Sequence, residues 1–103
     1  MASADLKRLL DADDDIVVLD ARESGDYSGA GGHIPGAKNI PLADVQSRVG
    51  ELESRRQRPL ALVCRTNKMS IQAAERLRSD GFNQVLIVED GMIGWAANGF
   101  TTE

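Results

Sequence analysis

The sequence of 103 residues contains one cysteine, Cys64, and one histidine, His33. A single cysteine excludes an intrachain disulfide, and one cysteine with one histidine cannot supply a Cys/His zinc cluster. No apolar run approaches the roughly 20 residues of a membrane-spanning helix, and the N-terminus lacks the basic-then-apolar layout of a secretory signal. We therefore expect a cytoplasmic protein that holds neither a metal nor another cofactor.

Basic residues are in the minority. Twelve Lys and Arg stand against sixteen Asp and Glu, which gives a formal net charge of -4 and argues against general binding to nucleic acids or anionic membranes. The proportions of hydrophobic residues (42%) and charged residues (27%) are ordinary for a folded protein. A chain of this length can bury one core without disulfides. We predict one domain over residues 1–103, as a monomer or weak dimer.

Three short apolar runs predict strands that are buried on both faces, as in parallel sheets. They are residues 16–19, 60–63 and 85–88, and a shorter strand is expected over residues 37–40. Helical patterns alternate with these runs, and Ser3 and Ser70 are the predicted N-caps of two helices. The helices are expected over residues 4–10, 42–53 and 70–78 and from residue 92. This alternation predicts a three-layer α/β domain with a central, mainly parallel sheet flanked by helices.

Cys64 directly follows the strand predicted over residues 60–63. Ligands bind at the carboxyl ends of strands in parallel α/β sheets. The helix expected to begin at Ser70 offers free N–H groups and a dipole that favour an anion. Arg65 and Lys68 add two cations beside the sulfur. Because these surroundings favour the thiolate, Cys64 is a candidate nucleophile rather than an inert buried cysteine.

We expect the loop after Cys64, residues 65–69, to curl around the sulfur. Several backbone N–H groups would then point at the thiolate or at an oxyanion of the substrate. Asn67 lies mid-loop and is one of the few non-glycine residues that tolerate the left-handed backbone of such a turn. The plainer interpretation is an ordinary turn asparagine with two solvated charges, Arg65 and Lys68.

His33 is a candidate general base, because Cys–His pairs are common in hydrolases. It lies in the turn-forming stretch Gly32-His33-Ile34-Pro35-Gly36, where a histidine more often holds the backbone than transfers protons. A thiolate needs no base when the leaving group is a stable anion, and sulfur transfer meets both conditions. We therefore expect His33 to be a structural residue near the site.

Three segments resemble the rhodanese family, and the resemblance covers nearly the whole chain. The first is Val17-Val18-Leu19-Asp20-Ala21-Arg22, and the second is Gly32-His33-Ile34-Pro35-Gly36-Ala37 with Asn39-Ile40-Pro41. The third runs from Leu62-Val63-Cys64-Arg65 through Ser70 and Gly81-Phe82 to Gly91-Met92-Ile93-Gly94-Trp95. The second segment matches the most recognisable signature of the family almost letter for letter.

The resemblance implies a sulfurtransferase whose active-site loop begins at the cysteine. Cys64 would take a sulfane sulfur from thiosulfate, a polysulfide or a persulfide, hold it as a persulfide, and pass it to a thiol or dithiol of a small molecule or a protein. Asp20 and Arg22 would be framework residues near the site, as a buried ion pair or loop anchor. The implied substrate-binding residues are Arg65, Thr66, Asn67, Lys68, Met69 and Ser70.

Two departures from the family pattern bear on the substrate. Asn67 stands where relatives often have Gly and Met69 where they often have Arg, so one oxyanion ligand of many relatives is missing. The stretch from Tyr27 to Gly32 looks about two residues longer than usual, which predicts a bulged loop.

Two other functions stay open. A phosphatase or arsenate reductase on the same fold would, by the resemblance, carry an Arg at the position that Ser70 holds here. A non-catalytic binding module would keep the fold without the chemistry. Inactive relatives commonly lose the cysteine, however, so we favour sulfur transfer through Cys64.

Overall fold

The chain folds around four short strands, β1 (Val17–Asp20), β2 (Lys38–Asn39), β3 (Leu60–Val63) and β4 (Val85–Ile87). In the computed structural model, which describes residues 1–103, they form one sheet in the order β2-β1-β3-β4. Every neighbouring pair is parallel; Leu19 pairs with Leu62, which pairs in turn with Ile87. The prediction of a mainly parallel sheet is confirmed.

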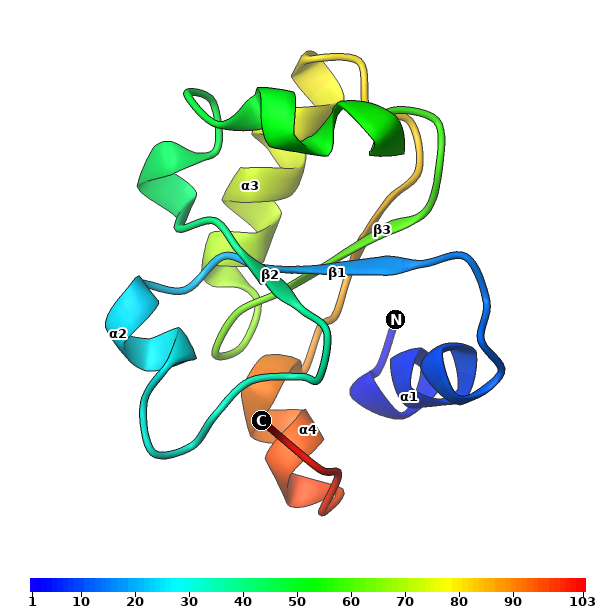
Figure 1. Cartoon of the computed structure of the whole chain (residues 1–103), viewed down its shortest axis with the longest axis vertical. Helices are drawn as coiled ribbons and strands as arrows, with labels where there is room; N and C mark the ends of the chain where they lie inside the picture. The colour runs from blue at the N-terminus through cyan, green and yellow to red at the C-terminus, as the bar shows by residue number, and fades with distance from the viewer.

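Helices cover both faces of this sheet (Figure 1). On one side lie α1 (Ser3–Asp11) and α4 (Gly91–Ala97); on the other lie α3 (Lys68–Ser79) and two 3-10 helices, η1 (Leu42–Asp44) and η2 (Val49–Arg55). Within β3, Leu60 and Leu62 belong to one apolar core, and Ala61 and Val63 to the other. Successive strand residues point to opposite faces, so the continuous apolar run of β3 serves both cores. The predicted three layers are therefore confirmed.

The structure corrects two helical predictions outside the segment that follows Cys64. Ser3 is not the N-cap of α1, because the helix begins at Ser3 and the buried Ser3 hydroxyl donates to Asp90 Oδ2 at 2.7 Å. Residues 42–53 do not form one α-helix; they form η1, a turn and most of η2. Gly50 and the β-branched Val45 and Val49 lie in this segment, and such residues form α-helix poorly.

The strand order creates a switch point between β1 and β3. From β1 the chain leads to β2 on one side, and from β3 it leads to β4 on the other. Connections that diverge in this way open a crevice at the carboxyl ends of the strands, where ligands of parallel sheets bind. Asp20 ends β1 and Cys64 follows β3. Cys64 thus lies at the carboxyl end of a central strand, as predicted.

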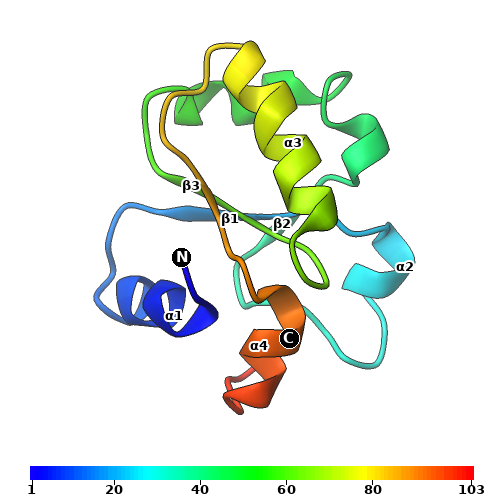
Figure 2. The same ribbon diagram turned by 180° about the vertical axis from the view of Figure 1, so that it is seen from behind.

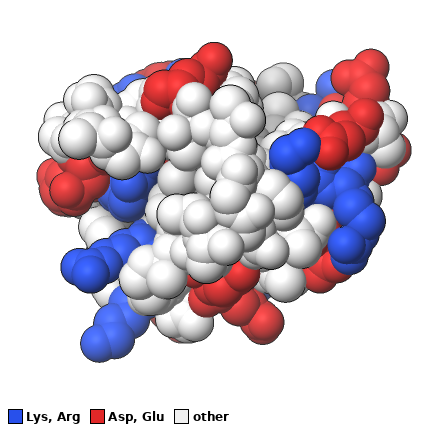
Figure 3. Space-filling model, turned by 90° about the horizontal axis from the view of Figure 1, so that it is seen from below, with Lys and Arg blue, Asp and Glu red and all other residues white.

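None of the helices has the length and apolar character needed to cross a membrane. The face seen in Figure 3 has an uncharged centre, and basic and acidic side chains are interspersed around its edge. This face therefore offers no broad basic surface, in keeping with the net charge of -4.

Candidate active site

Cys64 is almost fully buried, directly after the carboxyl end of β3. Its exposed fraction is 2%, and it belongs to neither core cluster. Figure 2 shows the loop that follows β3 lying between the start of α3 and the start of α4, with α2 (Ser24–Tyr27) on its other side. The thiol therefore stands at the edge of the sheet, where three helical segments meet.

The loop after Cys64 is shorter than predicted. Asn67 is the N-cap residue of α3, which begins at Lys68, so Ser70 lies inside the first turn rather than at the cap. Lys68 and Met69 are good helix formers, and Met69 packs against the core under α3, which favours the earlier start. Asn67 has a φ of -143°, so the expected left-handed backbone is also wrong. The buried Ser70 hydroxyl has no hydrogen-bond partner.

The start of α4 is hydrogen-bonded to the loop that follows Cys64. The N–H of Met92 donates to the carbonyl oxygen of Cys64 at 2.8 Å, and the next N–H donates to that of Arg65 at 3.1 Å. Gly91 has a φ of +54°, and a Cβ there would lie 2.4 to 2.5 Å from the carbonyl oxygens of Cys64, Arg65 and Thr66. Only glycine accepts both this backbone and this close approach.

The N–H groups of the loop have no partner in the protein. Across a trans peptide the C=O and N–H point in opposite directions, so carbonyls that face α4 turn the following N–H groups away from it. No backbone N–H from Arg65 to Ser70 donates to another protein atom. A helix start alone leaves its first turn unbonded, and here the loop extends that run back to Cys64. Consecutive free N–H groups of this kind suit an anion or a thiolate.

The free cations of the chain lie in the same segment. Of the twelve Lys and Arg side chains, only Arg65 and Lys68 make neither an ion pair nor a hydrogen bond. Both are exposed, and Thr66 between them is exposed as well. An acidic protein therefore keeps its uncompensated positive charge beside its one thiol.

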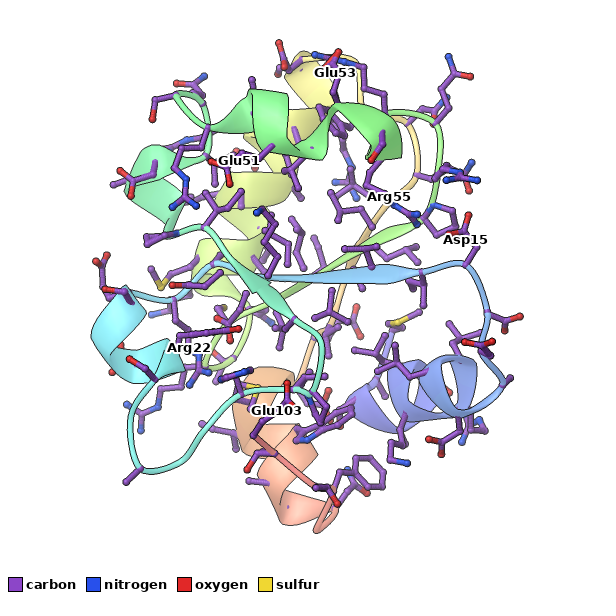
Figure 4. All side chains as sticks on the ribbon, in the orientation of Figure 1. Asp15, Arg22, Glu51, Glu53, Arg55 and Glu103 are labelled. Carbon is purple, nitrogen blue, oxygen red and sulfur yellow. The ribbon has the colours of Figure 1, made fainter.

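Ion pairs elsewhere are well formed. Hydrogen bonds from Arg48 and Lys38 lower the pKa of Glu51 to about 2. A hydrogen bond from Arg55 likewise lowers the pKa of Asp15. Figure 4 shows Asp15 and Arg55 near the amino end of β1, at the opposite end of that strand from Arg22. The ion pairs of Glu51 and Asp15 thus contribute to the fold, and the pair of Asp15 and Arg55 lies at the end of the sheet opposite to Cys64.

A hollow of about 500 Å³ opens between the loops that follow β1 and β3. Arg65 and Met69 reach it from the segment after Cys64, and Arg22 from the end of β1 (Figure 4). The remaining wall is formed by Gly25 and Asp26 of α2 and by residues 29–31 of the stretch predicted as a bulged loop. The full lining is Arg22, Gly25, Asp26, Gly29, Ala30, Gly31, Arg65 and Met69. The hollow therefore lies at the switch point of the sheet.

Asp20 and Arg22 form a buried ion pair, as the framework interpretation predicts. Asp20 is fully buried and accepts hydrogen bonds from the backbone N–H of Arg22 and from its guanidinium, with Nη2 at 2.8 Å. Arg22 Nη2 also donates to the carbonyl oxygen of Gly32 at 2.9 Å. The side-chain amide of Asn39 donates to the carbonyl oxygens of Asp20 and Arg22. Asn39 was not among the predicted site residues, although it lies within the motif Asn39-Ile40-Pro41.

His33 is held on both sides of its ring. Its Nδ1 lies 3.0 Å from the carbonyl oxygen of Tyr27, and the two rings stack at 3.7 Å. Its Nε2 lies 3.8 Å from a carboxylate oxygen of Glu103, and the two backbones exchange a pair of hydrogen bonds. His33 does not line the hollow. These contacts fit a structural residue that ties the loop after β1 to residues near the C-terminus.

Comparisons with known proteins agree with this geometry. A family model described as "Rhodanese-like domain" matches residues 2–98. The chain is 35% identical over 89 residues to "Putative sulfur carrier protein YrkF" of Bacillus subtilis, covering 86% of this chain and 46% of that protein. It is 31% identical over 93 residues to a protein named "Sulfurtransferase" from Allochromatium vinosum, covering 90% of this chain and 82% of that one.

A solved structure is similar over the same length. The solution structure of the rhodanese-like domain of the Anabaena Alr3790 protein matches with a TM-score of 0.88 at 30% identity, covering 100% of this chain and 76% of that one. The chain spans about half the length of the first curated relatives that it matches.

Proposed function

Since this chain belongs to the family of rhodanese-like domains, we propose that it is a sulfurtransferase that carries a sulfane sulfur on Cys64 as a persulfide. One observation carries the proposal: the single thiol stands at the start of a run of unbonded N–H groups and beside the two free cations. Relatives named as a sulfurtransferase and a sulfur carrier support the general role.

In the first half-reaction the Cys64 thiolate attacks the outer sulfur of thiosulfate or of a persulfide. The bond from Sγ to that sulfur forms, the S–S bond of the donor breaks, and its electron pair leaves with sulfite or with a thiolate. The free N–H groups from Arg65 to Ser70 stabilise the terminal sulfur of the persulfide. Arg65 and Lys68 attract the anionic donor.

In the second half-reaction cyanide or an acceptor thiolate attacks the outer sulfur, and Cys64 leaves as a thiolate. Neither half requires a side chain to move a proton, which agrees with the fastened ring of His33. Because the chain has no second cysteine to resolve the persulfide, release is intermolecular and the kinetics are ping-pong.

The other predicted contact residues fit supporting roles in the same loop. Thr66 and Asn67 form the loop beside the thiol, and Met69 lies in the lining of the hollow. The unpartnered hydroxyl of Ser70 is a further donor for the bound sulfur. The single domain over residues 1–103, the cytoplasmic location and the thiol or dithiol acceptor stay predictions.

Intact mass spectrometry tests the proposal. Wild-type protein incubated with a donor and no acceptor should gain one sulfur, about 32 Da, and lose it when cyanide is added. Cys64→Ser should abolish loading and turnover together, because a hydroxyl is a far poorer nucleophile than a thiolate. A melting curve of the variant checks that the fold is intact.

The same experiment separates the alternatives. Turnover by Cys64→Ser at the wild-type rate contradicts a persulfide on this residue. Hydrolysis of an aryl phosphate without sulfur loading indicates a phosphatase, and neither activity with any donor indicates a binding module.

A further inference from the structure

The carboxylate of Asp90 joins two helices that are far apart in the sequence. Asp90 is the residue before α4, and α1 and α4 lie on the same face of the sheet (Figure 1). Its Oδ1 accepts a hydrogen bond from the backbone N–H of Ser3 at 2.7 Å, and its Oδ2 accepts one from the Ser3 hydroxyl, also at 2.7 Å. Ser3 is fully buried and begins α1. Hydrogen bonds to an ionised group are among the stronger ones in proteins, so the start of α4 is firmly tied to the start of α1.

The far end of α4 is tied to the same serine. Asn98 directly follows α4, and its side-chain amide donates to Ser3 Oγ at 3.3 Å and to the carbonyl oxygen of Gly94 at 2.8 Å. Ser3 Oγ thus donates to one end of α4 and accepts from the other. Leu6 of α1 and Trp95 of α4 also belong to one apolar core. The two helices are therefore held together at both ends of α4.

Gly94 leaves the room that the carboxylate needs. A Cβ at this position would lie 1.9 Å from Asp90 Oδ2, and its three nearest atoms all belong to the Asp90 side chain. The φ of Gly94 is not positive, so its backbone does not require glycine, which is a poor helix former. The carboxylate of Asp90 thus accounts for a glycine inside α4.

The start of α4 also holds the loop after Cys64. The N–H groups of Met92 and Ile93 donate to the carbonyl oxygens of Cys64 and Arg65. Each of these carbonyls sets the direction of the N–H group across the same peptide plane. A shift in the first turn of α4 would therefore change where the free N–H groups of the loop point, although no side chain of the loop is altered.

We propose that Asp90 is a positioning residue for sulfur transfer at Cys64. It makes no hydrogen bond to the loop; it acts through Ser3, which fixes the first turn of α4 and with it the loop carbonyl oxygens. The inference rests on the proposed function and adds to it a residue that lies outside both the loop and the hollow.

Asp90→Ala removes both contacts with Ser3, and single-turnover loading by thiosulfate, followed by mass spectrometry, measures the effect. The maximal loading rate should fall about tenfold, because small displacements at a reacting group slow a reaction strongly. The donor concentration that gives half of that rate should stay within about twofold, because Arg65 and Lys68 still attract the donor. Unfolding of some chains would instead lower the fraction that loads and leave the rate unchanged.

Two matched variants separate positioning from stability. Asp5→Ala removes another carboxylate at the start of α1, which accepts from the N–H of Ala2 and pairs with Arg8 but makes no bond to α4. Its loading rate should equal that of the wild type. Asp90→Asn keeps an oxygen for the Ser3 N–H and offers an amide N–H to Ser3 Oγ, so loading should return to within about threefold of the wild-type rate.

Gly94 provides an independent test. Gly94→Ala should displace the carboxylate and slow loading to about the rate of Asp90→Ala. Asp90→Gly removes the atoms that the new methyl group would meet. Adding Gly94→Ala to Asp90→Gly should therefore slow loading no further, and it should raise the melting temperature, because alanine forms helix better than glycine.

Four results would overturn the proposal. They are a wild-type maximal rate in Asp90→Ala, an equal loss in Asp5→Ala, no recovery in Asp90→Asn, and a further loss when Gly94→Ala is added to Asp90→Gly. If Asp90→Ala does not fold, the Gly94 variants give the same readout.

Alkylation of Cys64 by iodoacetamide distinguishes a failure of this proposal from a failure of the proposed function. If no donor loads the wild type, sulfur transfer fails, but alkylation still reports the loop. The pH midpoint of the alkylation rate should then lie about half a unit higher in Asp90→Ala than in the wild type, because misdirected N–H groups favour the thiolate less. Asp5→Ala should leave the midpoint unchanged. An unchanged midpoint in Asp90→Ala contradicts the positioning role.

Discussion

The loops that follow β1 and β3 leave the same end of the sheet, but they use their polar groups in opposite ways. After β1, Asp20, Arg22 and Asn39 bond to one another and to the backbone, and His33 is fastened on both sides. After β3, every N–H from Arg65 to Ser70 lacks a protein acceptor. The polar groups after β1 are bonded within the protein, whereas the backbone N–H groups after β3 are free to bind a ligand.

The loop after β3 is nevertheless well held. Its carbonyl oxygens at Cys64 and Arg65 accept hydrogen bonds from the start of α4, while its N–H groups on the opposite side are free. A loop can thus be held in place through its carbonyl oxygens while its backbone N–H groups stay without hydrogen-bond partners.

The largest expected effect is on the rate of Cys64 loading and comes from displacing the loop after β3. Gly91→Ala adds a Cβ that would overlap three loop carbonyl oxygens. We expect Cys64 loading to fall roughly 100-fold, because displacements of about 1 Å at a reacting group have that effect. The measurement is the loading rate by mass spectrometry alongside a melting curve.

Gly99→Ala is the matched control for this variant. Gly99 has a φ of +71° and open space around its Cβ, so the substitution carries only the left-handed strain of about 1 to 2 kcal/mol. Loading should then stay near the wild-type rate. Equal losses of loading in the two glycine variants would show that the contact with α4 does not position the loop.

The next prediction concerns the loop after β1, whose polar groups are hydrogen-bonded within the protein. Asp20→Asn removes the buried charge that compensates Arg22, and breaking a buried pair destabilises a protein by about 3 kcal/mol or more. We expect denaturant unfolding to report that loss, while Cys64 still loads below the melting temperature. Asp11→Asn, which breaks the exposed pair with Lys7, should change stability by about 0.5 kcal/mol at most. Similar stabilities for the two variants would remove Asp20 from the framework.

A smaller effect is expected from the free cations. Replacing both Arg65 and Lys68 by Ala should slow alkylation of Cys64 by iodoacetate at neutral pH and raise the donor KM. We expect about a tenfold change at low salt that shrinks as salt screens the charges. Arg8→Ala removes a cation that is paired with Asp5 and serves as the control. Alkylation and donor kinetics like those of the wild type would make the two cations bystanders.

The smallest expected effect is on stability and comes from the exposed ion pair between Lys38 of β2 and Glu51. Hydrogen bonds lower the pKa of Glu51 from 4.5 to about 2, so its stabilising contribution is present above about pH 4.5 and is lost as the pH falls towards 2. Glu51→Gln should lower the melting temperature slightly at pH 7. The difference from wild type should vanish near pH 2; a difference that is constant with pH would contradict the ion-pair origin.

Local sequence patterns predict much of the fold. The run Leu60 to Val63 predicts a strand with the observed bounds, because both its faces are buried. The position of Cys64 follows from that strand alone. The ion pair of Asp20 and Arg22 is predicted from the family motif, and their contacts agree with it.

What the sequence did not reveal depends on partners far along the chain. Ser3 has the composition of an N-cap, yet its hydroxyl bonds to Asp90, 87 residues away. The role of Asn39 requires the register that sets it opposite Asp20. The hollow likewise joins residues from both loops at the switch point. Local sequence patterns do not predict these contacts, because each depends on how segments far apart in the sequence pack together.

The hold of α4 on the loop after Cys64 also bears on how this site can evolve. Main-chain atoms make that hold, so the side chains of Arg65, Thr66 and Lys68 have no part in keeping the loop in place. Under the proposed function, mutations at these positions should change which donor or acceptor is preferred and leave the backbone around Cys64 in place. The proposed reaction would then depend on Cys64 and on the backbone contacts at Gly91, whereas substrate preference would depend on the exposed side chains of the loop.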